Sequence, residues 1–154
     1  MHEDAKLSDG VVTLSPLGPA EPDPAPALHR PRPGQPWRAQ GPSQVFGIRA
    51  GRVVGALELR PAATGFAHGD VELSYALLPD ARGRGFATRA VRLACAHARA
   101  QGARRAVILV PAADSADSGP SGAVARRAGF VRRGQISHAD GTLWDWYVRS
   151  LARP

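Results

Sequence analysis

Apolar and polar residues alternate in several short stretches of the chain, and this alternation predicts β-strands. One stretch, 105–110, is instead almost continuously apolar, as expected of a strand that is buried on both faces. Turn residues join two pairs of stretches, Ala50-Gly51 in one and Asp140-Gly141 in the other, so each pair is predicted to form a β-hairpin. The predicted strands are residues 11–14, 44–49, 52–59, 70–78, 105–110, 131–137 and 143–151.

Two further stretches have the spacing of amphipathic helices. In 86–101, alanine and valine recur on one face at intervals of three and four residues, and Gly102 ends the pattern. The second helix is predicted over 120–128, with Gly129 as its C-terminal cap. The order β-ββ-β-α-β-α-ββ predicts an α/β (α+β) domain with a mixed, mainly antiparallel central sheet flanked by helices. The apolar stripe of the first helix consists of Ala87, Ala90, Val91, Ala94 and Ala98.

Proline dominates the segment between the first strand and the first hairpin. Nine prolines fall between Pro16 and Pro42. Because proline fixes φ and has no N–H donor, the segment fits neither a long helix nor a central strand. We therefore expect residues 16–42 to form a Pro-rich arm that is extended, polyproline-like or disordered.

The composition is that of a soluble protein. The chain has 154 residues, 44% hydrophobic and 21% charged, which predicts a single domain spanning 1–154. Its one cysteine, Cys95, cannot form an intrachain disulfide, which favours a reducing compartment. The polar start has no signal-peptide pattern, and no apolar run approaches the roughly 18 residues that span a bilayer, so a cytoplasmic protein without membrane contact is expected. The five histidines show no ligand spacing, and no metal site is expected.

Positive charge is concentrated in one part of the chain. The formal net charge is +7, and 19 of the 20 basic residues are arginine. Between Arg82 and Arg133 there are 11 arginines and two acids, whereas the rest of the chain carries nine basic and eleven acidic residues. This basic half is a candidate for holding a small polyanion. It lacks the interleaved aromatic residues of a nucleic-acid binder, so no nucleic-acid partner is expected.

A glycine-rich loop between a strand and a helix, Leu78 to Ala87, is the most informative segment. The first N–H groups of the helix lack intrahelical partners and lie at its positive end. Gly83 and Gly85 allow a positive φ and let an anion approach these amides. The loop therefore suits a phosphate or pyrophosphate, and it also fits a turn that needs glycine for its geometry alone. It is neither a Walker A loop, which requires lysine before Ser or Thr, nor a dinucleotide fingerprint, whose third glycine is Thr88 here.

Three motifs resemble one family. The pattern Q/R-x-x-G-x-G/A, met by Arg82, Gly85 and Ala87, is similar to the acetyl-CoA-binding motif of the GCN5-related N-acetyltransferases (GNAT). Glu72-Leu73-Ser74-Tyr75 resembles the E-I/L-G-Y strand of the branch that acetylates the N-termini of ribosomal proteins. Ser118 to Ser121, followed by Gly129-Phe130, resembles the N-x-x-S … G-F helix of that branch. The resemblance covers about 45–151 and the first strand.

The resemblance implies how acetyl-CoA would bind as co-substrate. In the family, backbone amides of the loop, here Arg82 to Ala87, hold the pyrophosphate. Two parallel strands, here 70–78 and 105–110, splay apart, and the pantetheine pairs with the exposed edge. The cofactor-binding residues implied are Leu77, Leu78, Arg82, Gly83, Arg84, Gly85, Phe86, Ala87 and Ser118.

Glu72 and Ser121 are the catalytic residues that the resemblance implies. Transfer to an amine needs a base for the amine's proton and a donor for the leaving thiolate. Glu72 is the candidate base, and Ser121, at the family's serine position, is the candidate donor. From the residues alone, Glu72 also fits a solvent-facing strand position, and Ser121 fits a helix-capping serine.

The implied function is an N-acetyltransferase that moves an acetyl group from acetyl-CoA to a primary amine by direct attack in a ternary complex. The acceptor is a protein N-terminus or a small molecule. Family members carry two helices between their first and second strands, and here the Pro-rich arm takes their place. An open amine-side cleft is therefore expected, which favours a large or flexible acceptor. The alternative is a degenerate acyl-CoA-binding module without turnover. Either a monomer or a homodimer is expected.

Overall fold

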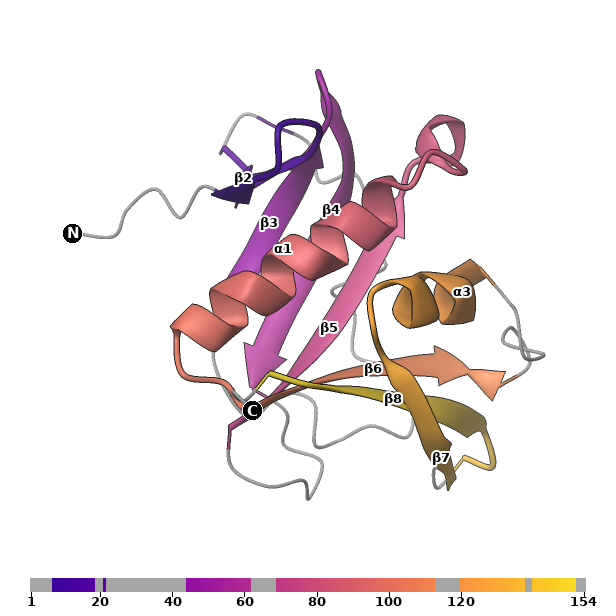
Figure 1. The fold of residues 1–154 in the computed structure, drawn as a ribbon. Coiled ribbons are helices and arrows are strands. Elements are labelled where there is room, and N and C mark those ends of the chain that lie inside the picture. The colour runs from indigo at the N-terminus through magenta and orange to yellow at the C-terminus, as the bar shows by residue number, and fades with distance from the viewer. Residues whose placement is uncertain are drawn as a thin grey trace.

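The structure of the protein is a computed structural model, which describes residues 7–18, 21, 44–61, 69–112, 120–137 and 140–151. Within these residues, eight strands form one sheet in the order β1-β2-β3-β4-β5-β6-β8-β7 (Figure 1). Every neighbouring pair is antiparallel except β5 and β6, which are parallel, so the predicted mixed, mainly antiparallel sheet is confirmed. The strands are β1 (Leu7–Ser8), β2 (Thr13–Pro16), β3 (Gln44–Arg49), β4 (Val53–Pro61), β5 (Asp70–Leu77), β6 (Arg105–Pro111), β7 (Val131–Ser137) and β8 (Leu143–Ser150).

Helices α1 (Phe86–Ala100) and α3 (Pro120–Arg127) pack on the same face of this sheet and contribute to one apolar core (Figure 1). A short 3-10 helix, η3 (Pro79–Ala81), connects β5 to the loop before α1. The alanine-rich stripe predicted for α1 is buried against the sheet. Its small side chains let the helix lie close to larger core residues such as Ile48 and Leu57. Among the residues described, no helix combines the length and the apolar composition that crossing a membrane requires.

The predicted elements end within two residues of their observed bounds, with one correction near the N-terminus. The first predicted strand lies at Thr13–Pro16 rather than at 11–14. The reason is Asp9, whose carboxylate accepts hydrogen bonds from the backbone N–H groups of Val11 (2.9 Å) and Val12 (2.8 Å) and so holds both residues outside the strand. The two-residue strand β1, which pairs with β2, was not predicted because two residues are too few to show alternation.

Strand β6 is buried on both faces, as its continuous apolar run predicts. Ala106, Ile108 and Val110 belong to the core beneath the helices. Val107 and Leu109 belong to a second apolar cluster on the opposite face. The other members of that cluster are Ile136, Trp144, Trp146 and Val148.

Most of the expected Pro-rich arm lies outside the described residues. Of positions 16–42, the structure describes 16–18 and Glu21. The carboxylate of Glu21 accepts hydrogen bonds from the guanidinium of Arg49 at 2.6 and 2.7 Å, and these bonds lower the pKa of Glu21 to about 2. The start of the arm is therefore tied to the end of β3.

Cys95 lies in α1 with its side chain buried in the core. Burial raises the pKa of its thiol to about 11, so the thiol is protonated at neutral pH. Cys95 therefore packs as a small buried residue.

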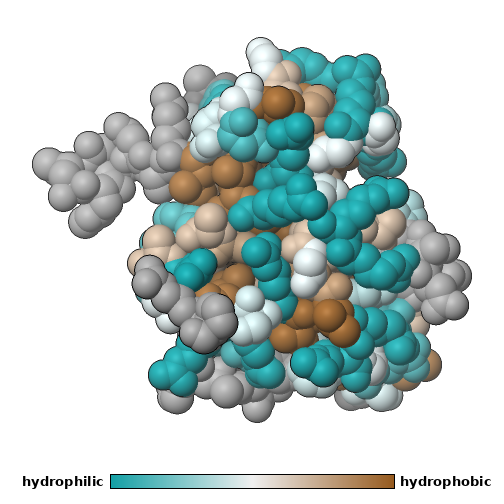
Figure 2. Space-filling view, viewed as in Figure 1, coloured by the Kyte–Doolittle hydropathy of each residue, from teal (hydrophilic) through white to brown (hydrophobic). Residues whose placement is uncertain are grey.

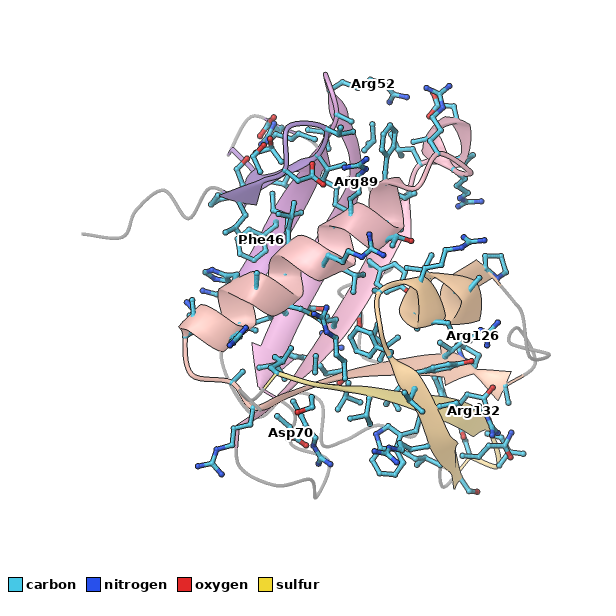
Figure 3. The ribbon with its side chains drawn as sticks, in the orientation of Figure 1. Phe46, Arg52, Asp70, Arg89, Arg126 and Arg132 are labelled. Carbon is cyan, nitrogen blue, oxygen red and sulfur yellow. The ribbon has the colours of Figure 1, made fainter. Side chains whose placement is uncertain are left out.

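The Asp9 carboxylate also links the β1–β2 hairpin to α1. Its second oxygen accepts a hydrogen bond at 2.9 Å from Arg89, which extends from the first half of α1 toward the hairpin (Figure 3). The backbone bonds from Val12 and Val11, followed by the bond from Arg89, lower the pKa of Asp9 to about 2.

We predict that Asp9→Asn lowers Tm by about 2–4 °C at pH 7. Because the pKa of Asp9 is lower in the folded than in the unfolded protein, its stabilising contribution is present above about pH 4 and is lost as the pH falls toward 2. The difference in Tm between variant and wild type should therefore shrink over that range in thermal melts followed by circular dichroism. Asp80→Asn is the control, because it removes only an exposed ion pair with Arg52 and should change Tm little. A difference that does not depend on pH would contradict the assignment.

Candidate functional site

The parallel pairing between β5 and β6 lasts for only three residue pairs. Asp70 pairs with Arg105, Val71 with Ala106, and Glu72 with Val107. Beyond Glu72, β5 continues to Leu77 in register with β4, and β6 continues to Pro111 in register with β8. The two strands therefore diverge, as the resemblance predicts for 70–78 and 105–110, and backbone groups on the facing edges have no ladder partner in the described sheet.

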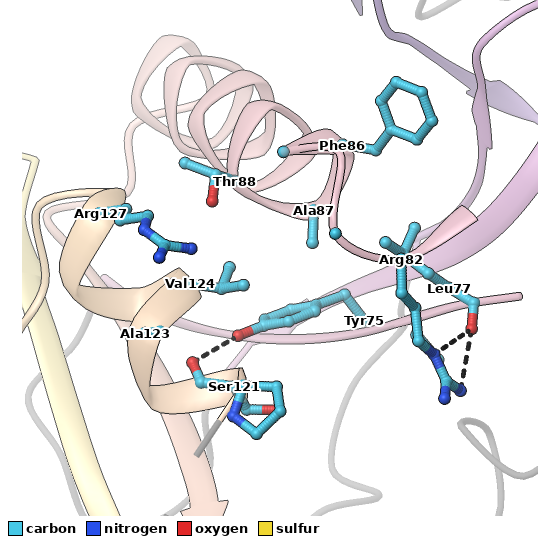
Figure 4. A pocket seen from close by; sticks show the side chains of 14 residues that line it. Tyr75, Leu77, Arg82, Phe86, Ala87, Thr88, Ser121, Ala123, Val124 and Arg127 are labelled. Atoms are coloured by element: carbon cyan, nitrogen blue, oxygen red, sulfur yellow. Dashed lines mark hydrogen bonds between the residues drawn. The ribbon is translucent and has the colours of Figure 1, made fainter. Parts of the chain in front are cut away.

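A cavity of about 520 Å³ lies at this divergence (Figure 4). We call it the divergence cavity. Its walls are 75–77 at the end of β5, the glycine-rich loop with the first turn of α1, and one side of α3. The sequence-predicted residues that line it are Leu77, Arg82, Gly83, Gly85, Phe86, Ala87 and Ser121.

Three predicted site residues lie elsewhere, and a fourth is not among the described residues. Leu78 is the N-cap of η3, and its backbone N–H donates to the carbonyl of Val54 at 2.8 Å. Neither Leu78 nor Arg84 lines the cavity. Glu72 is on the other face of the sheet. Ser118 lies outside the described residues.

The glycine-rich loop presents the positive end of α1 to the cavity. Gly83 and Gly85 both have φ of 80°, the left-handed conformation that their predicted role requires, and Gly85 is the N-cap of α1. A Cβ at either glycine would meet no atom of the described part of the chain within 4 Å. The first turn of α1 contains no acidic residue, and its N–H groups have no intrahelical acceptors. This arrangement suits the binding of an anion.

Arg82 closes one end of the cavity. Its Nε and Nη2 atoms donate to the carbonyl oxygen of Leu77 at 3.3 and 3.2 Å (Figure 4). These bonds fix the guanidinium at the end of β5 and leave its other N–H groups available, since arginine has five.

Tyr75 fastens α3 to β5 across the divergence. Its hydroxyl donates to the backbone carbonyl of Ser121 at 3.1 Å (Figure 4). Burial raises the pKa of Tyr75, so the hydroxyl remains protonated and acts as a donor. Ser121 is half-buried in the first turn of α3, where it lines the cavity.

Glu72 belongs to a buried ionic group on the opposite face. It is 2% exposed, so the solvent-facing interpretation of this residue is wrong. Arg60 lies directly across from it on β4, with Nη2 3.4 Å from Oε2 of Glu72. Arg60 also pairs with Glu58 at 2.5 Å and donates to the hydroxyl of Ser74 at 3.0 Å. The two catalytic candidates thus lie on opposite faces of the sheet, and Glu72 is at the last residue pair before β5 and β6 separate.

Seven residues of the cavity were not predicted as site residues: Tyr75, Ala76, Thr88, Pro120, Ala123, Val124 and Arg127. The signal for those on α3 was helical spacing, because Pro120, Val124 and Arg127 recur at intervals of four and three on one helix face. No group of three or more His, Cys, Asp or Glu side chains suited to a metal ion occurs in the described ranges.

The Acetyltransferase (GNAT) family matches residues 14–130. No curated protein sequence matches the chain significantly.

Several solved structures share the fold. A probable acetyltransferase of the GNAT family from Chromobacterium violaceum aligns over 96% of this chain and 86% of its own, with a TM-score of 0.69 and 21% identity. The ribosomal L7/L12 α-N-protein acetyltransferase RimL aligns over 73% of this chain and 72% of its own, with a TM-score of 0.60 and 22% identity. The microcin C7 self-immunity acetyltransferase MccE, in complex with acetyl-CoA and AMP, aligns over 70% of this chain with a TM-score of 0.58 and 20% identity. This chain spans 61% of the length of MccE. At these identities the likeness shows a shared fold.

Proposed function

Because the chain belongs to the GNAT acetyltransferase family, we propose that it transfers an acetyl group from acetyl-CoA to a primary amine. One observation carries the proposal: the gap between β5 and β6 opens beside the positive end of α1. A carrier molecule with a phosphate group and a long amide-containing arm needs both features. The positive end of α1 would bind its phosphate, and the free strand edge at the gap would pair with its arm.

The residues of the divergence cavity fit acetyl-CoA. The N–H groups at the start of α1 would bind the pyrophosphate. Gly83 and Gly85 would leave space for it, because no atom of the described residues lies near the positions of their missing side chains. The edge of β5 beyond Glu72 would pair with the pantetheine amides. When bound, acetyl-CoA supplies the activated acyl group, and the chain's own part is to orient that group at the gap.

The amine would approach from the face opposite the divergence cavity, where Glu72 lies. Its carboxylate would accept the amine's proton, directly or through a water molecule. The ion pair with Arg60 supports this role, since it positions the carboxylate. Donor and acceptor would then meet from two sides of one sheet.

Ser121 would donate a hydrogen bond to the thiolate that leaves. The bond from Tyr75 to the Ser121 carbonyl supports this assignment because it holds the first turn of α3 at the divergence. Of the cofactor-binding residues proposed, Leu78 and Arg84 would act through the backbone of the loop, because they do not line the cavity.

A protein N-terminus is the acceptor that we propose to test first. RimL, a protein α-amino acetyltransferase by name, shares the fold. A small-molecule amine is the second class of acceptor, and a peptide and polyamine panel separates the two by the release of free CoA from acetyl-CoA.

We predict that Gly85→Val abolishes acetyl-CoA binding in titration calorimetry, because the new side chain would obstruct approach to the amides at the start of α1. Gly51→Val is the matched control. Gly51 has φ of 78° and open space around its Cβ position, as Gly85 does, but lies in the β3–β4 turn. Both variants should lose similar stability, and only Gly85→Val should lose the ligand. A folded Gly85→Val protein with unchanged affinity would remove the loop from the site.

We predict that Glu72→Gln lowers kcat by about 100-fold or more near pH 7, and more at lower pH, where more of the amine is protonated. Affinity for acetyl-CoA should change little. Ser121→Ala should lower kcat by only about tenfold, because water can partly replace a hydroxyl donor. Steady-state CoA release between pH 6 and pH 9 measures both effects.

Glu58→Gln is the control for these two variants. It also removes one negative charge and one ion pair of Arg60, but Glu58 lies on β4, away from the gap. It should lower Tm and retain kcat. If Glu72→Gln and Ser121→Ala both kept full activity at every pH, neither residue would have the proposed role.

A further inference from the structure

A second cavity, of about 500 Å³, lies beside the divergence cavity, between α1, the C-terminal end of α3 and the end of β8. Four arginines line it, and we call it the arginine cavity. Arg92 and Arg99 come from α1, Arg127 from α3, and Arg149 from β8. Arg127 lines both cavities. Figure 2 shows hydrophilic side chains crossing this face of the molecule between apolar patches.

The charge of the arginine cavity is not balanced by neighbouring acids. Among the residues that the structure describes, none that lines this cavity is acidic. In the ion pairs that the structure describes, every carboxylate pairs with an arginine that lies outside this cavity. Those pairing arginines are Arg49, Arg52, Arg60, Arg89, Arg105 and Arg132. A concave site with four cations and no anion favours a negatively charged ligand.

Two of the four arginines are fixed by the end of α3. Arg92 Nη2 donates to the carbonyl of Arg127 at 2.7 Å, and Arg149 Nη1 donates to the carbonyl of Ala128 at 3.1 Å. These bonds satisfy carbonyls at the negative end of the helix and hold both guanidinium groups in place. The side chain of Arg127 is exposed, and no hydrogen bond of its guanidinium is found among the described residues. Arg127 is therefore able to turn toward a ligand in either cavity.

The arginine cavity lies one helical turn from the phosphate end of the divergence cavity. Thr88 lines the first cavity and Arg92 the second, and four residues along a helix span about 6 Å. In CoA, one ribose separates the pyrophosphate from the 3′-phosphate, a similar distance. A phosphate monoester carries close to two negative charges at pH 7 and accepts the paired hydrogen bonds that a guanidinium donates.

We infer that Arg127, supported by Arg92, binds the 3′-phosphate of CoA and makes the protein selective for donors that carry it. This inference rests on the proposed function, because it assigns the far end of the same donor. Arg127, which lines both cavities, would then be a specificity-determining residue, and the 3′-phosphate of CoA would occupy the arginine cavity.

Titration calorimetry with acetyl-CoA and with 3′-dephospho-acetyl-CoA tests the inference. Wild-type protein should bind acetyl-CoA roughly 10- to 100-fold more tightly than the dephospho form. Arg127→Gln should lower the affinity for acetyl-CoA to nearly that for the dephospho form and leave the latter unchanged within about twofold. Arg127→Lys, which keeps the charge but not the planar fork, should be intermediate. Arg133→Gln removes the same charge from an exposed position of β7 that lines neither cavity, and should retain the preference.

The outcomes separate this inference from the proposed function. Equal binding of the two donors by the wild type would overturn the role of the arginines and leave the proposed function standing. Binding of neither donor would overturn both. Adenosine 3′,5′-bisphosphate should compete with acetyl-CoA. The contrary result is that inorganic phosphate or pyrophosphate binds as a second ligand to protein already saturated with acetyl-CoA, and that this binding is absent in Arg127→Gln. The arginine cavity would then be a separate anion site, and the inference would be wrong.

Discussion

The early end of the parallel ladder between β5 and β6 is the constraint on which the rest of the site depends. Each strand is held along its other edge by an antiparallel partner, β5 by β4 and β6 by β8, over seven residue pairs. Neither strand can therefore swing across to close the gap without breaking a ladder that it already makes. The gap is a fixed feature of the sheet, and its edges carry backbone groups that a ligand can bond.

Every other element of the site takes its place from this gap. β5 ends beside it, so the loop that follows brings the positive end of α1 to the same point. Tyr75 ties α3 to the far side, and Glu72 marks the last pair on the opposite face. On the proposed function, the donor would bind on the helix face of the sheet and the acceptor on the face where Glu72 lies. Glu72, held by Arg60, would then serve the acceptor face, and the arginines would serve the donor face.

Local patterns in the sequence predicted most of the fold, because strand alternation and helix spacing depend on neighbouring residues. The left-handed glycines, Gly83 and Gly85, were predictable for the same reason. The site was only partly predictable, since its remaining features depend on contacts between distant segments. Arg60 meets Glu72 only when β4 and β5 pair, which is why an exposed Glu72 also fitted the sequence. Arg127 and Thr88 line the same cavity only because α3 packs beside α1.

Amide hydrogen exchange with and without CoA tests the central claim, that the gap between β5 and β6 is the donor site, most directly. Ligand pairing with the free edge of β5 should slow exchange at amides within 73–77, and binding at the start of α1 should slow it within 83–88. Amides of β3, which lies two strands away, should exchange at the same rate in both states. Slower exchange in the loop alone, with β5 unchanged, would contradict the account, because the gap would then take no part in binding.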